Sequence, residues 1–156
     1  MNPSEFTIVS GGQTGADRAA LDWAIQSGVP HGGWCPKGRK AEDGPIPERY
    51  KLRETAKDDY VERTELNVRD SDVTVVFTVN AEATGGSRKT IEYLRKYNKP
   101  CLHLSQARHG QDASGLLRAF LRQYQPKVMN VAGSRASKEP GVAGFVFQTL
   151  QNALNT

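Results

Sequence analysis

The chain has 156 residues, with 21 Lys and Arg against 17 Asp and Glu, a formal net charge of +4 and two cysteines. This length predicts a single domain, residues 1–156, that is large enough to bury a hydrophobic core. No apolar run reaches the roughly 18 residues that a membrane span needs, and the start of the chain lacks a secretory signal pattern. Two cysteines are too few for a disulfide framework, so we expect a cytoplasmic protein without a membrane partner.

The positive charge is unevenly distributed along the sequence. Between Ser105 and Pro140 there are six Lys or Arg residues against only Asp112 and Glu139. A basic surface suits nucleic acid or a small polyanion. The chain has no recognition-helix, zinc-finger or ribonucleoprotein motif, and its aromatic residues do not alternate with basic ones. These features favour a small anionic ligand over nucleic acid.

The first predicted strand, Phe6–Ser10, runs into a glycine-rich turn, Gly11–Gly15, and then a helix that ends at Gly28. A strand, a glycine turn and a helix start form an anion-binding geometry, because free backbone N–H groups converge there. The spacing matches neither the dinucleotide motif nor the P-loop motif. Thr14 and Asp17 have the spacing of a capping box, and Asp17 has two interpretations, a helix cap or a polar contact to ligand.

A second strand is predicted over Val29–Trp34, followed by a long loop, Cys35–Pro47, that contains three prolines and two glycines. Long loops within compact domains are often functional. This loop leaves the carboxyl end of a strand, where open α/β sheets bind ligands. We therefore expect Lys37 and Arg39 to lean over the anion site, although a solvated charged loop is the alternative.

The middle of the chain contains a helical pattern over Glu48–Asp59 and a connecting segment, Tyr60–Arg69. The next strand, Val73–Thr78, is a nearly continuous apolar run, which is typical of a strand that is covered on both faces. The second glycine turn, Gly85–Arg88, then begins another helix, for which Ser87 is the predicted cap.

The last third repeats the alternation of strand and helix. Its predicted elements are strand Pro100–Leu104, helix Ser114–Tyr124, strand Lys127–Val131, a third turn Ala132–Arg135, and helix Val142–Leu154. Such alternation predicts an α/β fold, a doubly wound parallel sheet of about five strands with helices on both faces. All three turns then lie at the carboxyl edge of the sheet, and the first two face each other if the first and third strands are neighbours.

These motifs resemble the molybdenum carrier family, that is, the molybdenum cofactor carrier proteins. The resemblance spans nearly the whole chain in order, and it rests on Gly11–Asp17, Gly33–Arg39, Ala41–Gly44, Arg63–Glu65, Asn67–Val68, Asp70–Asp72, Gly85–Ser87 with Thr90, and Asn130–Arg135.

The resemblance implies a Rossmann-like fold, a homo-oligomer (dimer or tetramer), and binding of the molybdenum cofactor without turnover. The partners would then be molybdoenzymes or cofactor biosynthesis proteins that donate or accept the cofactor. Neither a catalytic residue nor a metal-ligating side chain is expected. The predicted cofactor-binding residues are Gly11, Gly12, Gln13, Thr14, Gly15, Lys37, Arg39, Gly85, Gly86, Ser87, Arg88, Ser134 and Arg135.

Two alternatives share the same anion-binding turns. The wider superfamily includes the lysine-decarboxylase-like nucleoside monophosphate phosphoribohydrolases, whose glycine motif places a glutamate where this chain has Glu92. Arg63 lies roughly where those enzymes have a catalytic arginine, whereas Arg88 stands in place of a motif glycine. In this interpretation Glu92 and Arg63 are catalytic. A nucleotide-sensing module without catalysis is the third hypothesis.

Overall fold

The computed structural model describes residues 6–154 and has one main sheet of five parallel strands. The strand order is β2-β1-β7-β5-β6, and every neighbouring pair is parallel. The bounds are β1 (Thr7–Val9), β2 (His31–Gly32), β5 (Val73–Thr78), β6 (Cys101–Ser105) and β7 (Val128–Gly133). A separate two-stranded ladder pairs β3 (Trp34–Cys35) with β4 (Arg53–Glu54).

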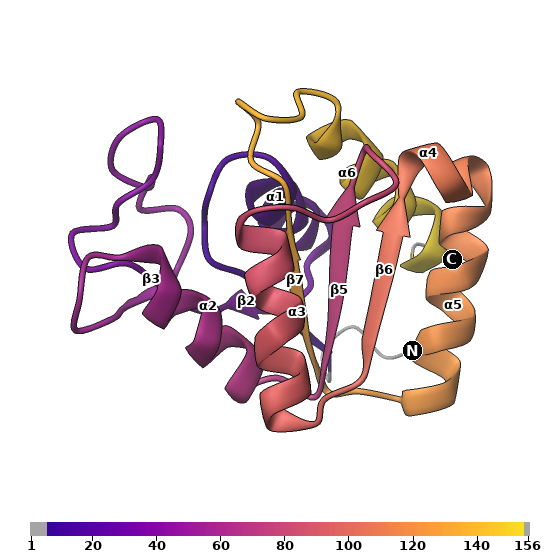
Figure 1. Cartoon of the computed structure of the whole chain (residues 1–156), viewed down its shortest axis with the longest axis horizontal. Helices are drawn as coiled ribbons and strands as arrows, with labels where there is room; N and C mark the ends of the chain where they lie inside the picture. Colours follow the sequence, from indigo (N-terminus) through magenta and orange to yellow (C-terminus); the bar gives the residue numbers. More distant parts are fainter. Residues whose placement is uncertain (1–5, 155–156) are drawn as a thin grey trace.

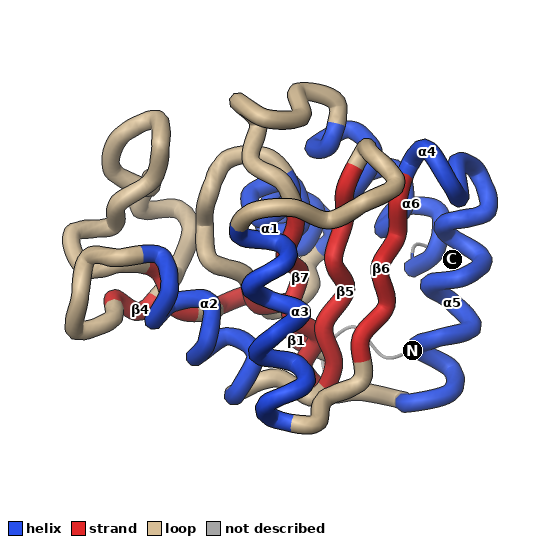
Figure 2. The backbone as a smooth tube through the Cα atoms, in the orientation of Figure 1, coloured by secondary structure: helices blue, strands red, loops and turns tan. Residues whose placement is uncertain are grey.

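Helices cover both faces of this sheet (Figures 1 and 2). One layer is formed by α1 (Ala16–Ser27), α6 (Val142–Leu154) and α5 (Ala113–Tyr124), and the other by α2 (Tyr60–Arg69) and α3 (Gly86–Tyr97). The short α4 (Gln106–His109) and a 3-10 turn, Gly110–Asp112, connect β6 to α5. The predicted Rossmann-like α/β fold is confirmed. None of the helices within residues 6–154 is long and apolar enough to cross a bilayer.

Strand β5 lies inside the sheet, between β7 and β6, and all six of its residues are buried. The main core lies between the strands and the layer of α1, α5 and α6. There the ring of Phe77 on β5 meets the ring of Phe145 on α6 edge to face, with centroids 5.8 Å apart. The prediction of an interior strand covered on both faces is confirmed.

The condition under which the first two glycine turns would face each other is not met, because β7 lies between β1 and β5. The last strand of the chain therefore occupies the centre of the sheet. If β7 is counted first, the spatial order of the strands becomes 3-2-1-4-5, which matches the first five strands of the dinucleotide-binding order 3-2-1-4-5-6. The point where the winding changes direction then lies between β7 and β5, and the loops that follow these two strands meet at the top edge in Figure 1.

The predicted helix over residues 48–59 is wrong. The amides of Arg53 and Thr55 instead donate to the carbonyls of Gly33 (2.9 Å) and Cys35 (2.8 Å), which makes a short β ladder. The Tyr50 side chain is buried in a second, small core with Leu21, Cys35, Ala41 and Ile46. This tertiary packing overrides the local helical pattern.

The predicted connection at residues 60–69 is also wrong, because this segment is helix α2. The Asp59 carboxylate caps its start by accepting a hydrogen bond from the Glu62 amide (3.1 Å). The buried positions of α2 are Arg63, Asn67 and Val68, so its inner face is largely polar. An apolar periodicity therefore did not reveal it.

Both predicted serine and threonine caps are wrong as well. Helix α1 has Gly15 at its N-cap and α3 has Gly85, and neither has a side-chain cap. The hydroxyl of Thr14 instead accepts from the amide of Ala136, at 3.2 Å. Ser87 lies inside the first turn of α3. Glycine occupies the cap positions because both backbones have positive φ, +85° at Gly15 and +56° at Gly85.

Candidate functional site

A polar cleft lies at the carboxyl edge of the sheet, at the point where the winding changes direction. It encloses about 140 Å³, which is less than the roughly 300–1,000 Å³ of a pocket that surrounds a whole small-molecule ligand. It therefore accommodates one anionic group or one small ring, and a larger ligand would extend to the rim. Its lining includes Gly11, Gln13, Asp17, Arg63, Thr64, Asn80, Glu82, Gly86, Ser87, Thr90, Asn130, Ser134, Arg135, Lys138 and Glu139.

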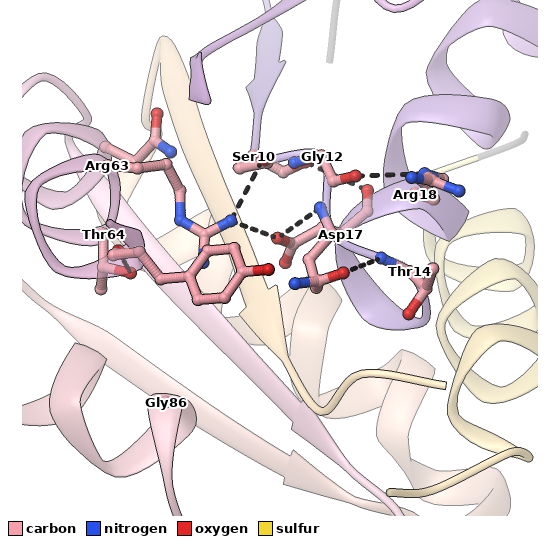
Figure 3. A network of polar contacts seen from close by, with 12 residues as sticks. Ser10, Gly12, Thr14, Asp17, Arg18, Arg63, Thr64 and Gly86 are labelled. Atoms are coloured by element: carbon pink, nitrogen blue, oxygen red, sulfur yellow. Dashed lines mark hydrogen bonds and ion pairs between the residues drawn. The ribbon is translucent and has the colours of Figure 1, made fainter. Parts of the chain in front are cut away.

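The floor of the cleft contains a buried acid–base pair. Figure 3 shows Arg63 and Asp17 pointing toward each other, and Arg63 Nη1 lies 3.8 Å from Asp17 Oδ2. Arg63 Nη1 also donates to the carbonyl of Gly11 at 3.2 Å. A Cβ atom at Gly11 would lie 2.3 Å from Arg63 Cδ, so glycine is needed for Arg63 to cross the turn.

Burial dominates the electrostatics of this pair. It raises the pKa of Asp17 to about 6, although the charge of Arg63 and the hydrogen bond from the Gln13 amide both act to lower it. Burial likewise lowers the pKa of Arg63, and Asp17 opposes that change. A buried carboxyl group with a raised pKa in a cleft is a frequent feature of functional sites.

Gln13 brings an unpaired hydrogen-bond donor to the same cleft. Its Oε1 accepts from the amides of Thr14 (3.1 Å) and Glu42 (2.9 Å), which fixes the orientation of the side-chain amide. Within residues 6–154, Nε2 has no hydrogen-bond partner, although Gln13 is only 5% exposed. A buried donor without a partner is costly, so this atom is suited to a ligand acceptor.

The rim of the cleft is open and carries two cations, Arg135 and Lys138, beside two acids, Glu82 and Glu139. Helix α3 begins here with no acidic residue in its first turn, and no residue of the described range accepts from the Gly86 amide. Lys138 Nζ lies 3.0 Å from the position that a Cβ atom at Gly85 would occupy. The Arg135 guanidinium lies over the ring of Tyr60, 5.4 Å from its centroid. The start of a helix and two cations together favour an anion.

Glu139 ties the loop after β5 to the third turn. Its carboxylate accepts from the amides of Val79 (2.9 Å) and Asn80 (2.7 Å) and from the hydroxyl of Ser134. Burial raises the pKa of Glu139, but these hydrogen bonds outweigh it and hold the pKa below its usual value. Glu139 is thus an ionised structural group that shapes one wall of the cleft.

The long loop packs behind the first glycine turn, and none of residues 35–47 lines the cleft. Two adjacent acids hold it there. Glu42 accepts from the hydroxyl of Thr14 and from the amide (3.2 Å) and hydroxyl (2.6 Å) of Ser137, whereas Asp43 pairs with Arg18, with Nη2 to Oδ1 at 2.7 Å. Figure 3 shows Arg18 on the opposite side of the glycine turn from Arg63.

Replacing Glu42 by glutamine is expected to loosen this loop. The hydrogen bonds from Ser137 and Thr14 lower the pKa of Glu42, so they favour the carboxylate, and a neutral amide would accept them more weakly. We expect several-fold faster amide hydrogen exchange at Ser137 in Glu42→Gln. Glu48→Gln, at an exposed position directly after the loop, is the control. Equal exchange in the two variants would contradict the role given to Glu42.

The structure brings together only some of the predicted binding residues. Of the residues predicted to contact cofactor, those that line the cleft are Gly11, Gln13, Gly86, Ser87, Ser134 and Arg135, joined by Arg63 of the hydrolase hypothesis. Those outside its lining are Gly12, Thr14, Gly15, Lys37, Arg39, Gly85 and Arg88. The binding role of every one of these residues stays a prediction.

Two residues outside the lining, one from each hypothesis, make contacts elsewhere. The Arg39 side chain donates to the carbonyls of Ile46, Pro47 and Tyr50 at 2.8–2.9 Å, so it braces its own loop. Glu92 is exposed, 3.4 Å from Lys89 Nζ, and is not among the residues that line the cleft.

Three amides of the first turn are not free, which corrects the expectation that the amides of this turn converge on an anion. Gly12 N donates to Ser10 Oγ (3.4 Å), Gln13 N to Asp17 Oδ2 (3.2 Å) and Thr14 N to Gln13 Oε1 (3.1 Å). The turn therefore presents its side chains, rather than these amides, to the cleft.

Sequence reasoning did not assign Lys138, Glu139, Thr64, Thr90 or Asn130 to the site. Asn130 carried a usable signal, because it is a polar residue in the middle of an otherwise apolar strand. The other four residues lie on helices or in a polar loop, where polar and charged residues are common and do not indicate a binding site.

The fold and the cleft define a class, the Rossmann-like α/β proteins that bind a ligand where the winding of the sheet changes direction. A family model described as the circularly permutated YpsA SLOG family matches residues 8–154, so the chain belongs to this family. The permutation agrees with the strand order, in which the last strand takes the place of the first.

Solved structures add one strong similarity. The crystal structure of a putative molybdenum carrier protein from Syntrophus aciditrophicus is 45% identical, with a TM-score of 0.92, and the alignment covers 95% of this chain and 94% of that one. An (E)-4-hydroxy-3-methyl-but-2-enyl diphosphate reductase is only distantly similar, at 12% identity with a TM-score of 0.42, and that alignment covers 94% of this chain and 59% of the reductase. No curated protein matches the chain significantly.

Proposed function

We propose that the chain is a non-catalytic carrier that binds, protects and delivers the molybdenum cofactor, a pyranopterin with a phosphate and an oxidised molybdenum centre. The observation that carries this proposal is the cleft, where the start of α3, Arg135 and Lys138 face a polar floor. The similarity to a molybdenum carrier supports it. The proposal includes a single ligand-binding domain, residues 1–156, a cytoplasmic location, exchange with molybdoenzymes or cofactor biosynthesis proteins, and a homo-oligomer.

The charges of the cleft suit a cargo with an anionic end. On the floor, Asp17 accompanies Arg63, so the cations left for an anion are Arg135 and Lys138 at the rim, where Glu82 and Glu139 also line the cleft. A charge-assisted hydrogen bond contributes about 1.5–3 kcal/mol, so a few such contacts give affinity in the micromolar range and still permit release. The phosphate or the oxo-anion therefore binds at the rim, beside the start of α3.

A holding assay under anaerobic conditions tests the carrier function directly. The protein is incubated with cofactor released from a molybdoenzyme and desalted, and molybdenum and the fluorescent pterin oxidation product are quantified per chain. We expect both to co-elute with the protein in nearly stoichiometric amounts and to transfer to an apo molybdoenzyme. Failure to retain either one would overturn the proposal.

Charge removal at the rim is expected to weaken retention. Arg135→Gln and Lys138→Gln should each raise the dissociation constant of the cofactor about tenfold or more, because each removes one charge-assisted contact. The matched control is Lys127→Gln, an exposed lysine before β7, at the opposite edge of the sheet. The measurement is molybdenum retained against cofactor concentration. Equal retention by all three variants would refute this placement of the anion, and a loss in Lys37→Gln instead would favour the loop.

The second candidate is a nucleoside monophosphate phosphoribohydrolase, because the structure does place Arg63 in the cleft with a carboxyl group beside it. That carboxyl group is Asp17 and not Glu92. A buried acid with a raised pKa is able to assist bond cleavage. Incubation of the wild-type protein with nucleoside monophosphates and quantification of released base tests this candidate. A nucleotide-sensing module would bind these compounds without releasing base.

A further inference from the structure

The floor of the cleft offers a ligand both a donor and an acceptor. Gln13 Nε2 is buried and has no partner among the described residues. The Asp17 carboxylate, four residues further on, lines the same cleft. It accepts from the Gln13 amide at 3.2 Å and faces Arg63 at 3.8 Å. An ionised carboxylate has about four acceptor positions, so capacity remains for a ligand.

We propose that Asp17 and Gln13 recognise the 2-amino-4-oxopyrimidine edge of a fused heterocycle. In this arrangement the ring N–H and the exocyclic amino group donate to Asp17, and the ring carbonyl accepts from Gln13 Nε2. Pterins and guanine share this edge. The choice of a pterin as the ring rests on the proposed function, whereas recognition of the edge itself rests on the floor residues alone.

The charge distribution favours a ring over an anion at this position. A phosphate or an oxo-anion placed on the floor would lie against the Asp17 carboxylate, and like charges in a buried place repel strongly. At the rim, Arg135 and Lys138 offset the acids Glu82 and Glu139, and the start of α3 adds its positive dipole end. The enclosed volume of about 140 Å³ admits the pyrimidine ring, and the rest of the heterocycle extends toward the rim. The ring thus lies on the floor and the anionic group at the rim.

The experiment compares two ligands that differ at one group. Pterin carries the 2-amino group, and lumazine carries an oxo group there instead. Fluorescence titration of the full-length protein is expected to give a dissociation constant at least about tenfold lower for pterin, because lumazine leaves one charge-assisted bond to Asp17 unmade.

Two variants test whether Gln13 and Asp17 bind the ring edge. Gln13→Glu keeps the acceptor for the amides of Thr14 and Glu42 but removes the free donor, and it should weaken pterin binding about tenfold or more. Its charge-matched control is Gln123→Glu, an exposed residue on α5 that should leave binding unchanged. Asp17→Asn should bring the pterin and lumazine dissociation constants close together. If Asp17→Asn does not fold, the comparison of pterin with lumazine in the wild type and the binding of pterin by Gln13→Glu still test the inference.

Equal binding of pterin and lumazine by the wild-type protein, or binding of neither, would overturn the inference. A preference for pterin over lumazine that persists in both Gln13→Glu and Asp17→Asn would also overturn it. Tighter binding of guanosine monophosphate than of pterin, with inosine monophosphate weak, would support recognition of the edge and assign the ring to guanine. The proposed function is tested independently. If the protein retains molybdenum but binds pterin and lumazine equally, only the inference about the ring edge is refuted. If it prefers pterin but retains no molybdenum, only the carrier function is refuted.

Discussion

Replacing Gly15 by alanine is expected to lower the free energy of unfolding by about 3 kcal/mol or more, or to prevent folding. Gly15 has φ +85° and ψ −124°, a conformation that only glycine adopts readily. A Cβ atom there would lie 2.4 Å from the carbonyl oxygen of Ser134. That oxygen accepts from the Ala16 amide at 3.1 Å, so the first and third turns are in direct backbone contact and neither is free to move away.

Gly28→Ala is the matched control for this prediction. Gly28 also has positive φ, +71°, but no atom lies within 4 Å of the Cβ position there. Its substitution should cost only about 1–2 kcal/mol, the price of the left-handed backbone conformation. Urea unfolding of the wild type and both variants measures the difference. Similar losses in the two variants would show that the contact between the turns contributes little.

The second large expected effect is a decrease in the free energy of unfolding with rising pH, caused by ionisation of the buried Asp17 carboxyl group. The pKa of Asp17 is about 6 in the folded protein, against an ordinary value of 3.8. The folded state therefore binds the proton more tightly, and the contribution of Asp17 to stability falls as pH rises from about 4 to about 6. The difference of about two pKa units corresponds to roughly 3 kcal/mol.

Asp17→Asn does not titrate in this range, so it serves as the reference. The free energy of unfolding of the wild type minus that of Asp17→Asn should fall by about 2 kcal/mol between pH 4 and pH 7. Urea unfolding at a series of pH values measures this difference. Asp58→Asn, which removes an exposed carboxyl group, controls for the general loss of negative charge. A difference that does not vary with pH would show that burial does not perturb Asp17.

The two predictions concern the same turn from opposite sides. Gly15 lets the first turn approach the third turn closely, and Gly11 lets Arg63 cross over it to reach Asp17. The resulting position of Asp17 is unfavourable for folding at neutral pH. A local cost of this kind at a cleft is expected of a binding site, where a ligand group satisfies the buried polar atoms.

The main architecture was predictable because its signals are local. The apolar run at Val73–Thr78 indicates a strand covered on both faces, and the apolar stripes of the helices at 113–124 and 142–154 indicate their buried faces. The alternation of these elements is sufficient to predict a parallel α/β sheet. The strand order was not predictable, because pairing of β7 between β1 and β5 depends on contacts between distant segments.

The candidate site was likewise predictable only where its signals are local. The glycine turns at 11–15, 85–88 and 132–135 are visible in the sequence, since glycine marks positions of positive φ and close approach. Whether their amides are free is a matter of tertiary structure, and in the first turn Ser10, Asp17 and Gln13 already satisfy three of them.

The sequence by itself determined the fold class, the three turns and the family that they resemble. Only the tertiary structure decided that α2 turns a polar face inward, which brings Arg63 to Asp17, and that the long loop lies behind the first turn and not over the cleft. The reason is that apolar periodicity reports burial in a hydrophobic core. Polar side chains that are buried for binding have no such period, and their partners come from segments that are far apart in the chain.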